Sequence, residues 1–180
     1  MTALVVALTG TDHHRFERMV QWIDAAALRH RDVRFVIQHG ASGPPSVAEG
    51  HEFLAHDHLM AMLAEACVVV CHGGPGTIMD AREAGHVPLC VPRDPRLGEH
   101  VDGHQQRFAA AAAGEGVVLA ISSLEAFHRA LDDALVAPAS VAIPAPRRAR
   151  DEARAKVAAE LDDILAVRPR RLVRRPRLVR

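Results

Sequence analysis

Three polar segments of the sequence carry side chains that could do chemistry. The segments are GTDHH (10–14), CHGGPGT (71–77) and RDPRLGEHVDGHQ (93–105). They contain histidines, carboxylates and glycines, which can transfer protons, accept hydrogen bonds from hydroxyl groups and let a backbone approach a ligand closely. No segment is specific by itself, so their meaning depends on whether the fold brings them together.

The glycine-rich segment predicts a turn that binds a phosphate or pyrophosphate. Gly73, Gly74 and Gly76 permit a close approach, and a helix is predicted to begin directly afterwards, so the free N–H groups of its first turn would favour an anion. Thr77 adds a hydroxyl donor, and Asp80 could accept hydrogen bonds from the two hydroxyls of a ribose. The alternative is a plain tight turn, because the segment matches neither the P-loop nor the spaced dinucleotide fingerprint.

The first segment offers a general base. His13 and His14 follow a predicted strand, and Asp12 beside them could orient an imidazole. A histidine titrates near neutral pH, so either one is a candidate catalytic base, although both also suit an ordinary polar helix start. A covalent mechanism is less favoured, because the chain has no GxSxG motif and Cys71 has no obvious paired base.

A metal is the weaker interpretation of the third segment. His100 and His104 are four residues apart, and zinc would need a further ligand such as Cys71 or His72. That spacing also requires helix across Gly103, and HExxH is absent. We therefore expect no metal site and no cofactor.

Apolar runs and amphipathic stretches alternate along the chain. This order predicts a doubly wound, Rossmann-like α/β fold with a parallel sheet, whose polar loops meet at the carboxyl ends of the strands. The segment 39–50 is expected to be a loop. The predicted strands span 3–9, 33–38, 67–71, 88–92 and 117–121, and the predicted helices 16–27, 58–66, 77–84, 104–113 and 124–135.

Composition bounds the class of protein. The 180 residues are 49% hydrophobic with zero formal net charge, which argues against nucleic-acid binding by the whole domain. Three cysteines in apolar runs, with neither a signal peptide nor a membrane span expected, predict a cytoplasmic protein. The predicted organisation is a domain over 1–137, a proline-rich connector over 138–146, a helix over 147–167 and an arginine-rich tail over 168–180.

The three segments together resemble a known family. HGGPGTIMDAREAGHVPLCVPR followed by LGEHVDGHQ resembles the glycosyltransferase family 28 C-terminal domain, the donor-binding half of GT-B glycosyltransferases. The opening GTDHHRFERMV resembles the start of its small standalone members. Those are soluble subunits of two-component transferases in dolichol-linked N-acetylglucosamine transfer and bacterial exopolysaccharide assembly. The resemblance covers roughly residues 3–125.

The resemblance implies a UDP-sugar as donor and assigns roles by position. Asp80 stands where the family commonly has a glutamate that holds the uridine ribose, and Pro75 departs from the small or varied residue expected in the turn. His104 and Gln105 would lie by the donor sugar, with Glu99 and His100 shaping their loop. The pyrophosphate would be bound by Thr11, His72, Gly73, Gly74, Gly76 and Thr77.

The implied reaction is inverting displacement at the anomeric carbon, assisted by helix N-termini and a positive group and not by a metal. The acceptor half of a GT-B enzyme is missing from this chain, so a membrane-associated partner subunit and a lipid-linked acceptor are expected. The arginine-rich tail would contact an anionic membrane from the cytoplasmic side, or be a solvated tail. Two alternatives stay open: a non-catalytic nucleotide-sugar-binding module and an epimerase-like enzyme.

Overall fold

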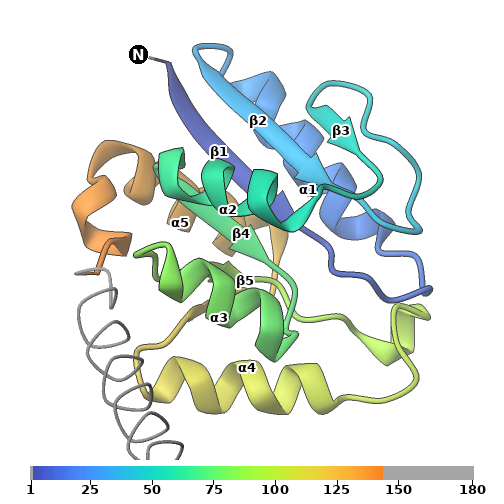
Figure 1. The fold of residues 1–180 in the computed structure, drawn as a ribbon. Coiled ribbons are helices and arrows are strands. Elements are labelled where there is room, and N and C mark those ends of the chain that lie inside the picture. Colours follow the sequence, from blue (N-terminus) through green and yellow to red (C-terminus); the bar gives the residue numbers. More distant parts are fainter. Residues whose placement is uncertain (1, 144–180) are drawn as a thin grey trace, which may run out of the picture. The chain divides into compact units, whose positions relative to one another are not determined.

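Six parallel strands form one sheet in the computed structural model of this chain (Figure 1). The structure describes residues 2–143; the predicted helix over 147–167 and the arginine-rich tail lie outside the described residues. Each strand pairs in parallel with its neighbours, in the order β3-β2-β1-β4-β5-β6. The strands are β1 (Ala3–Leu8), β2 (Val33–Gln38), β3 (Glu49–His51), β4 (Val68–Cys71), β5 (Leu89–Cys90) and β6 (Leu119–Ala120).

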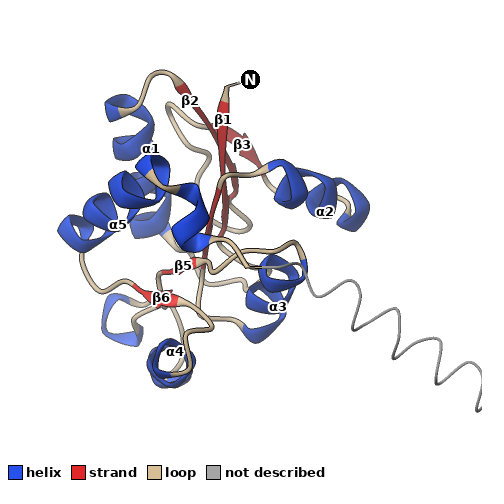
Figure 2. Ribbon diagram, turned by 90° about the vertical axis from the view of Figure 1, so that its left-hand side faces the viewer, coloured by secondary structure: helices blue, strands red, loops and turns tan. Residues whose placement is uncertain are grey.

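Helices cover both faces of the sheet (Figure 2). Because side chains alternate along a strand, Val5 and Ala7 of β1 face one layer, while Val6 and Leu8 face the other. The first layer contains α1 (Glu17–Arg29) and α5 (Leu124–Val136), and the second contains α2 (His56–Glu65) and α3 (Pro75–Glu83). Helix α4 (His104–Gly114) packs against α3 and β5 through Ala109 and Ala112.

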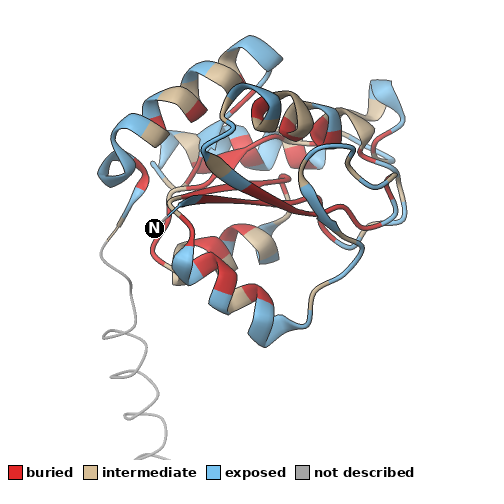
Figure 3. Ribbon diagram, turned by 90° about the horizontal axis from the view of Figure 1, so that it is seen from above, coloured by how far each residue is buried: buried red, intermediate tan, exposed pale blue. Residues whose placement is uncertain are grey.

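The faces that each strand and helix buries explain the residue pattern that predicted it. The central strands are buried on both sides, which is why they consist of continuous apolar runs (Figure 3). Helices α1 and α5 bury one apolar stripe each and expose the rest. The doubly wound α/β prediction is confirmed.

The chain order creates a switch point between β1 and β4. From β1 the chain winds outward through β2 to β3, then returns to place β4 on the other side of β1. Loops on the two sides of such a point diverge, leaving a crevice at the carboxyl ends of the strands. The segments after β1 and β4 are GTDHH and HGGPG, so the fold brings two of the three polar segments to this crevice.

Several elements differ from the sequence prediction. The expected loop over 39–50 runs into a three-residue edge strand, β3, whose sequence EGH carries no apolar pattern. Helix α3 begins at Pro75 and not at Thr77, because proline suits the first position of a helix, where its missing N–H costs nothing. Strands β5 and β6 have only two residues each, and those of β6 are exposed.

The start of the expected proline-rich connector packs against the domain. Residues Pro138–Val141 form a short 3-10 helix, and Val141 is buried in the core beside α5. The N–H of Val87 donates to the Val141 carbonyl at 2.7 Å, and that of Ile143 to Gly85 at 2.8 Å. Among the described residues, no helix has the length and apolar character that crossing a membrane would require.

Candidate functional site

A cavity of about 370 Å³ opens at the switch point. Its size suits a small organic ligand. Six of the residues predicted to bind the donor line it: Thr11, His72, Gly74, Gly76, Thr77 and Asp80. Loops that are more than sixty residues apart in sequence therefore share one pocket, which favours a binding site over a plain turn.

The glycines at the cavity make room for the His72 ring. Gly10 has a φ of +85°, and a Cβ on it would lie 2.5 Å from His72 Nε2. A Cβ on Gly74 would overlap the same ring, and one on Gly73 would lie 2.8 Å from Gln105 Cβ. The turn needs glycine because His72 and Gln105 fill the space that side chains there would occupy.

Helix α3 directs the N–H groups of its first turn toward this cavity. Gly74 is its N-cap, and no side chain caps it. The first four N–H groups of a helix have no partner within the helix, so those of Gly76 and Thr77, both lining the cavity, are suited to bind an anion. Asp80 lies one turn further along the same wall.

The opposite wall of the cavity was missed at the level of sequence. It consists of Phe53 and Leu54 from the segment between β3 and α2, together with His56 and Leu59 of α2 and Gln38 at the end of β2. Phe53 is 55% exposed, unusual for so large an apolar side chain. The signal was hidden because β3 lacks a strand pattern, so the residues after it were not recognised as another loop at the carboxyl edge.

A buried arginine, also missed, holds the loops in place. Arg93 is 1% exposed and its Nη1 donates to the carbonyls of His14 at 2.6 Å and Glu99 at 2.9 Å, while its Nη2 donates to that of Thr9 at 2.8 Å. Its guanidinium also stacks over Phe16, 4.8 Å from the ring centroid. Burial lowers the pKa of Arg93, while Asp12 and Glu99 oppose that shift. The sequence showed only a basic residue after a strand.

Two residues that were predicted to contact the sugar donor, Glu99 and Gln105, are buried and make hydrogen bonds within the protein. Glu99 accepts from Arg18 Nε at 2.8 Å and Nη2 at 2.7 Å, and from the N–H of Asp94 at 2.7 Å. Gln105 Oε1 accepts from the N–H of Gly73 at 3.1 Å and of Arg93 at 3.3 Å. Both residues shape the loops in this structure, and a direct contact with a donor stays a prediction for them.

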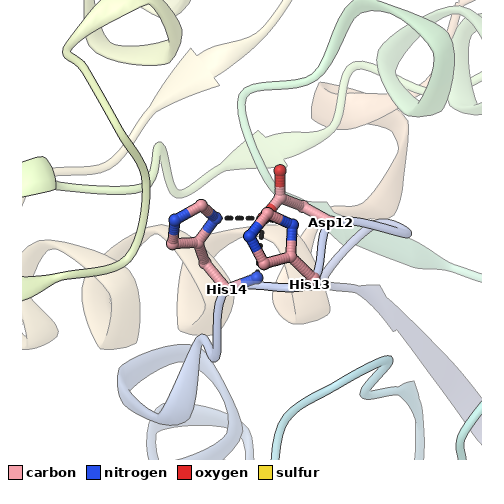
Figure 4. Close-up of side chains that lie close together, drawn as sticks. All are labelled: Asp12, His13 and His14. Carbon is pink, nitrogen blue, oxygen red and sulfur yellow. Dashed lines mark hydrogen bonds and ion pairs between the residues drawn. The ribbon is translucent and has the colours of Figure 1, made fainter.

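The remaining predicted residues form a polar cluster outside the cavity lining. We define the histidine cluster as Asp12, His13 and His14 from the loop after β1, and His100, Asp102 and His104 from the loop before α4 and the first residue of that helix. Figure 4 shows the side chains of Asp12, His13 and His14 close together on the loop after β1. Cys71, considered above as a zinc ligand, is fully buried beside Cys90 in the sheet and belongs to no group of potential metal ligands found among the described residues.

Within the cluster, Asp12 makes its hydrogen bonds with His14. Asp12 Oδ1 lies 2.6 Å from His14 Nδ1, and the N–H of His14 donates to the same oxygen at 2.7 Å. His13 is 87% exposed and its Nδ1 is 3.8 Å from that oxygen. Partial burial would raise the pKa of Asp12, but the hydrogen bonds from His14 and the charge of Arg93 lower it to about 2. Asp12 is therefore ionised at neutral pH and orients His14.

The pH dependence of folding is expected to report on His72. Burial, followed by the charge of Arg93, lowers the pKa of His72 to about 4, below its usual 6.5. As the pH falls, His72 is protonated in the unfolded chain before it is protonated in the folded chain. The free energy of unfolding is therefore highest above pH 6.5 and declines as the pH falls toward 4. The loss between pH 7 and pH 5 should be about 2 kcal/mol. Urea unfolding at pH 7 and 5 measures it, and a His72→Phe variant should lose this slope; an equal slope in both proteins would contradict the assignment.

The sheet order and the switch-point cavity define a doubly wound α/β domain of the Rossmann-like class. A model of the glycosyltransferase family 28 C-terminal domain matches residues 5–161, and the chain belongs to this family. No curated protein matches the sequence.

Solved structures support the fold. The glycotransferase of kitacinnamycin aligns with a TM-score of 0.57 and 19% identity over 77% of this chain and 36% of that one. CalG4, the calicheamicin glycosyltransferase, aligns with a TM-score of 0.56 and 17% identity over 93% of this chain and 43% of its own. The present chain thus spans less than half the length of either structure.

Proposed function

We infer that this chain supplies the donor-binding half of a glycosyltransferase that uses a UDP-sugar. The observation that carries this proposal is the switch-point cavity, which joins a glycine turn, a helix N-terminus, a carboxylate and an apolar wall. Family membership supports sugar transfer, and the chemistry of the lining supports a nucleoside diphosphate as the part of the donor that binds here.

The lining residues suggest how the donor would lie. The pyrophosphate would accept hydrogen bonds from the N–H groups at Gly76 and Thr77, with Thr11 on the other side. Asp80 would accept hydrogen bonds from the ribose hydroxyls, one helical turn beyond the phosphates. The uracil ring would lie against Phe53 and Leu54, where the exposed ring of Phe53 offers a flat apolar face for stacking.

The proposed transfer proceeds by direct displacement. The acceptor oxygen would attack the anomeric carbon of the sugar while the bond from that carbon to the UDP oxygen breaks. His14 would take the proton of the acceptor hydroxyl, with Asp12 fixing its tautomer, and the N-terminus of α3 would stabilise the charge that grows on UDP. His104 would contact the donor sugar. No resident cofactor or metal has a role in this reaction.

The acceptor half would come from another polypeptide. This chain covers 36% and 43% of two structures that share its fold, and the proposal assigns it the donor site and the base but no acceptor site. The acceptor would be lipid-linked, and the partner subunit membrane-associated at the cytoplasmic face. The arginine-rich tail would contact that membrane surface. The sugar transferred would be N-acetylglucosamine or another hexose or hexuronic acid, and the product a polysaccharide or glycan.

Titration of the purified full-length chain with UDP tests the donor site. Asp80→Ala is expected to weaken UDP binding by about 10- to 100-fold, because a hydrogen bond to a charged group is worth about 1.5–3 kcal/mol. Isothermal calorimetry of both proteins gives the two dissociation constants, and UDP should bind more tightly than ADP or GDP.

The matched control is Asp57→Ala. Asp57 lies exposed in the first turn of α2, near the cavity but outside its lining, so it makes the same charge change without touching the ligand. UDP binding that Asp80→Ala and Asp57→Ala leave equally strong would remove the ribose assignment. Failure of the wild-type chain to bind UDP would remove the proposed function itself.

A further inference from the structure

The histidine cluster gathers more metal-ligating atoms than the proposed transfer reaction uses, which assigns roles there only to Asp12, His14 and His104. The Asp12 carboxylate has three imidazole nitrogens around it: His14 Nδ1 at 2.6 Å, His100 Nε2 at 3.4 Å and His13 Nδ1 at 3.8 Å. His104 extends the cluster, with its ring centroid 4.5 Å from that of His100. Nitrogen and carboxylate ligands around one point are the donor set of zinc and its first-row neighbours.

One separation between the two loops matches that of two ligand atoms on a zinc ion. Two ligand atoms on a tetrahedral zinc ion, each about 2.0–2.1 Å from the metal, lie about 3.3 Å apart. The separation of Asp12 Oδ2 from His100 Nε2 is 3.4 Å. Asp12, His13 and His14 each offer one atom such that all three lie within 4.8 Å of one another.

The two loops are already held in position without a metal. Arg93 donates to the carbonyls of His14 and Glu99, so one guanidinium fixes the backbone beside a ligand in each loop. Arg18 anchors the second loop again through Glu99. Fixed ligands lose little freedom when an ion binds, which favours affinity.

A second grouping of histidines with an acid provides a contrast. His30 and His128 lie near Asp132, but Arg29 donates to the Asp132 carboxylate at 2.9 Å and lies 3.2 Å from His128 Nδ1. A cation therefore already occupies that position. Near Asp12 the guanidinium of Arg93 directs its Nη atoms to three backbone carbonyls and not to the carboxylate. The Asp12 carboxylate can therefore still bind a metal cation.

We propose that the histidine cluster binds one first-row transition-metal ion, with Asp12, His13, His14 and His100 as its ligands. Because His14 and Asp12 are also the proposed base and its partner, the bound ion would block sugar transfer. The site links the loop after β1 to the loop before α4. Asp12 supplies the negative charge that selects a cation, and His13, exposed and free to rotate, closes the coordination from the solvent side.

The experiment uses the untagged full-length chain, freed of metal and without any sugar nucleotide, so its result does not depend on the proposed transfer reaction. Calorimetric titration with ZnCl₂ should show one ion per chain, and Co²⁺ should give the intense visible absorption of a tetrahedral complex. Asp12→Asn and His100→Ala, one from each loop, should each weaken Zn²⁺ binding at least about tenfold, a loss that removal of a group supporting a ligand already causes. His58→Ala, a change of an exposed histidine on α2, should leave it unchanged.

A second measurement removes the dependence on variant folding. Zn²⁺ should protect His13, His14 and His100 of the wild-type chain from acylation by diethyl pyrocarbonate, as mapped by mass spectrometry, while His58 stays reactive. The proposal is overturned if the wild-type chain binds no Zn²⁺, if His100→Ala binds as tightly as wild type, or if the protected histidines lie elsewhere.

Discussion

An Arg93→Met variant is expected to lose about 3–5 kcal/mol of its free energy of unfolding, a large share of the stability of a small domain. Methionine keeps the unbranched stem but has no guanidinium group, so the carbonyls of Thr9, His14 and Glu99 would lose their buried partner. Each unsatisfied buried carbonyl costs about 1–3 kcal/mol, while relief from burying a charge offsets part of the sum. The stacking on Phe16 is lost as well.

Urea unfolding followed by circular dichroism measures this effect, and Arg96→Met is the matched control. Arg96 lies three residues away with its side chain 83% exposed, and its salt bridge to Asp94 is on the surface, so its replacement should change stability by about 0.5 kcal/mol or less. Arg93→Lys should not restore the wild-type value, because one ammonium group cannot reproduce the fork that reaches three carbonyls. If Arg93→Met and wild type had the same midpoint of urea unfolding, the loops would be stable without the Arg93 hydrogen bonds.

The sequence contained what was needed to predict the framework. Strands β1 and β4 are continuous apolar runs because both of their faces are buried, and α1 and α5 show a single apolar stripe because only one of their faces is buried. The glycine turn, Thr77 and Asp80 were recognisable because their types suit a helix N-terminus that receives an anion. Their meeting in one cavity followed from the order of strands and helices.

The parts that escaped prediction depend on three-dimensional neighbours. Strand β3 forms because its backbone pairs with β2 at the sheet edge, and its residues EGH carry no period. Phe53 therefore had no assigned place near the cavity. Arg93 shows the same limit, since a basic residue after a strand is commonly exposed and only its contacts with the distant segment after β1 and with Glu99 explain its burial. Local pattern finds elements, and contacts between elements decide which polar residue is structural.

The base assignment separates His14 from its neighbour in sequence. His14→Ala is expected to lower kcat for sugar transfer by about 10²- to 10⁴-fold, because no group would take the acceptor proton, while UDP affinity stays within about twofold. His13→Ala is the matched control: His13 is 87% exposed and 3.8 Å from Asp12, whereas His14 is held at 2.6 Å. Its loss should change kcat little when EDTA keeps metal ions out of the assay.

This measurement requires the complete enzyme. The chain would be co-expressed with its acceptor-binding partner and supplied with a panel of UDP-sugars and lipid-linked acceptors, and kcat and the dissociation constant of UDP would be compared for each variant. Asp12→Asn should also lower kcat, because the amide no longer stabilises the imidazolium that forms when His14 takes the proton. Equal activity of His14→Ala and wild type would place the base in the partner. UDP release from a UDP-sugar by this chain alone, at the rate of the complete enzyme, would show that no partner is needed, and the two-component arrangement would fall with it.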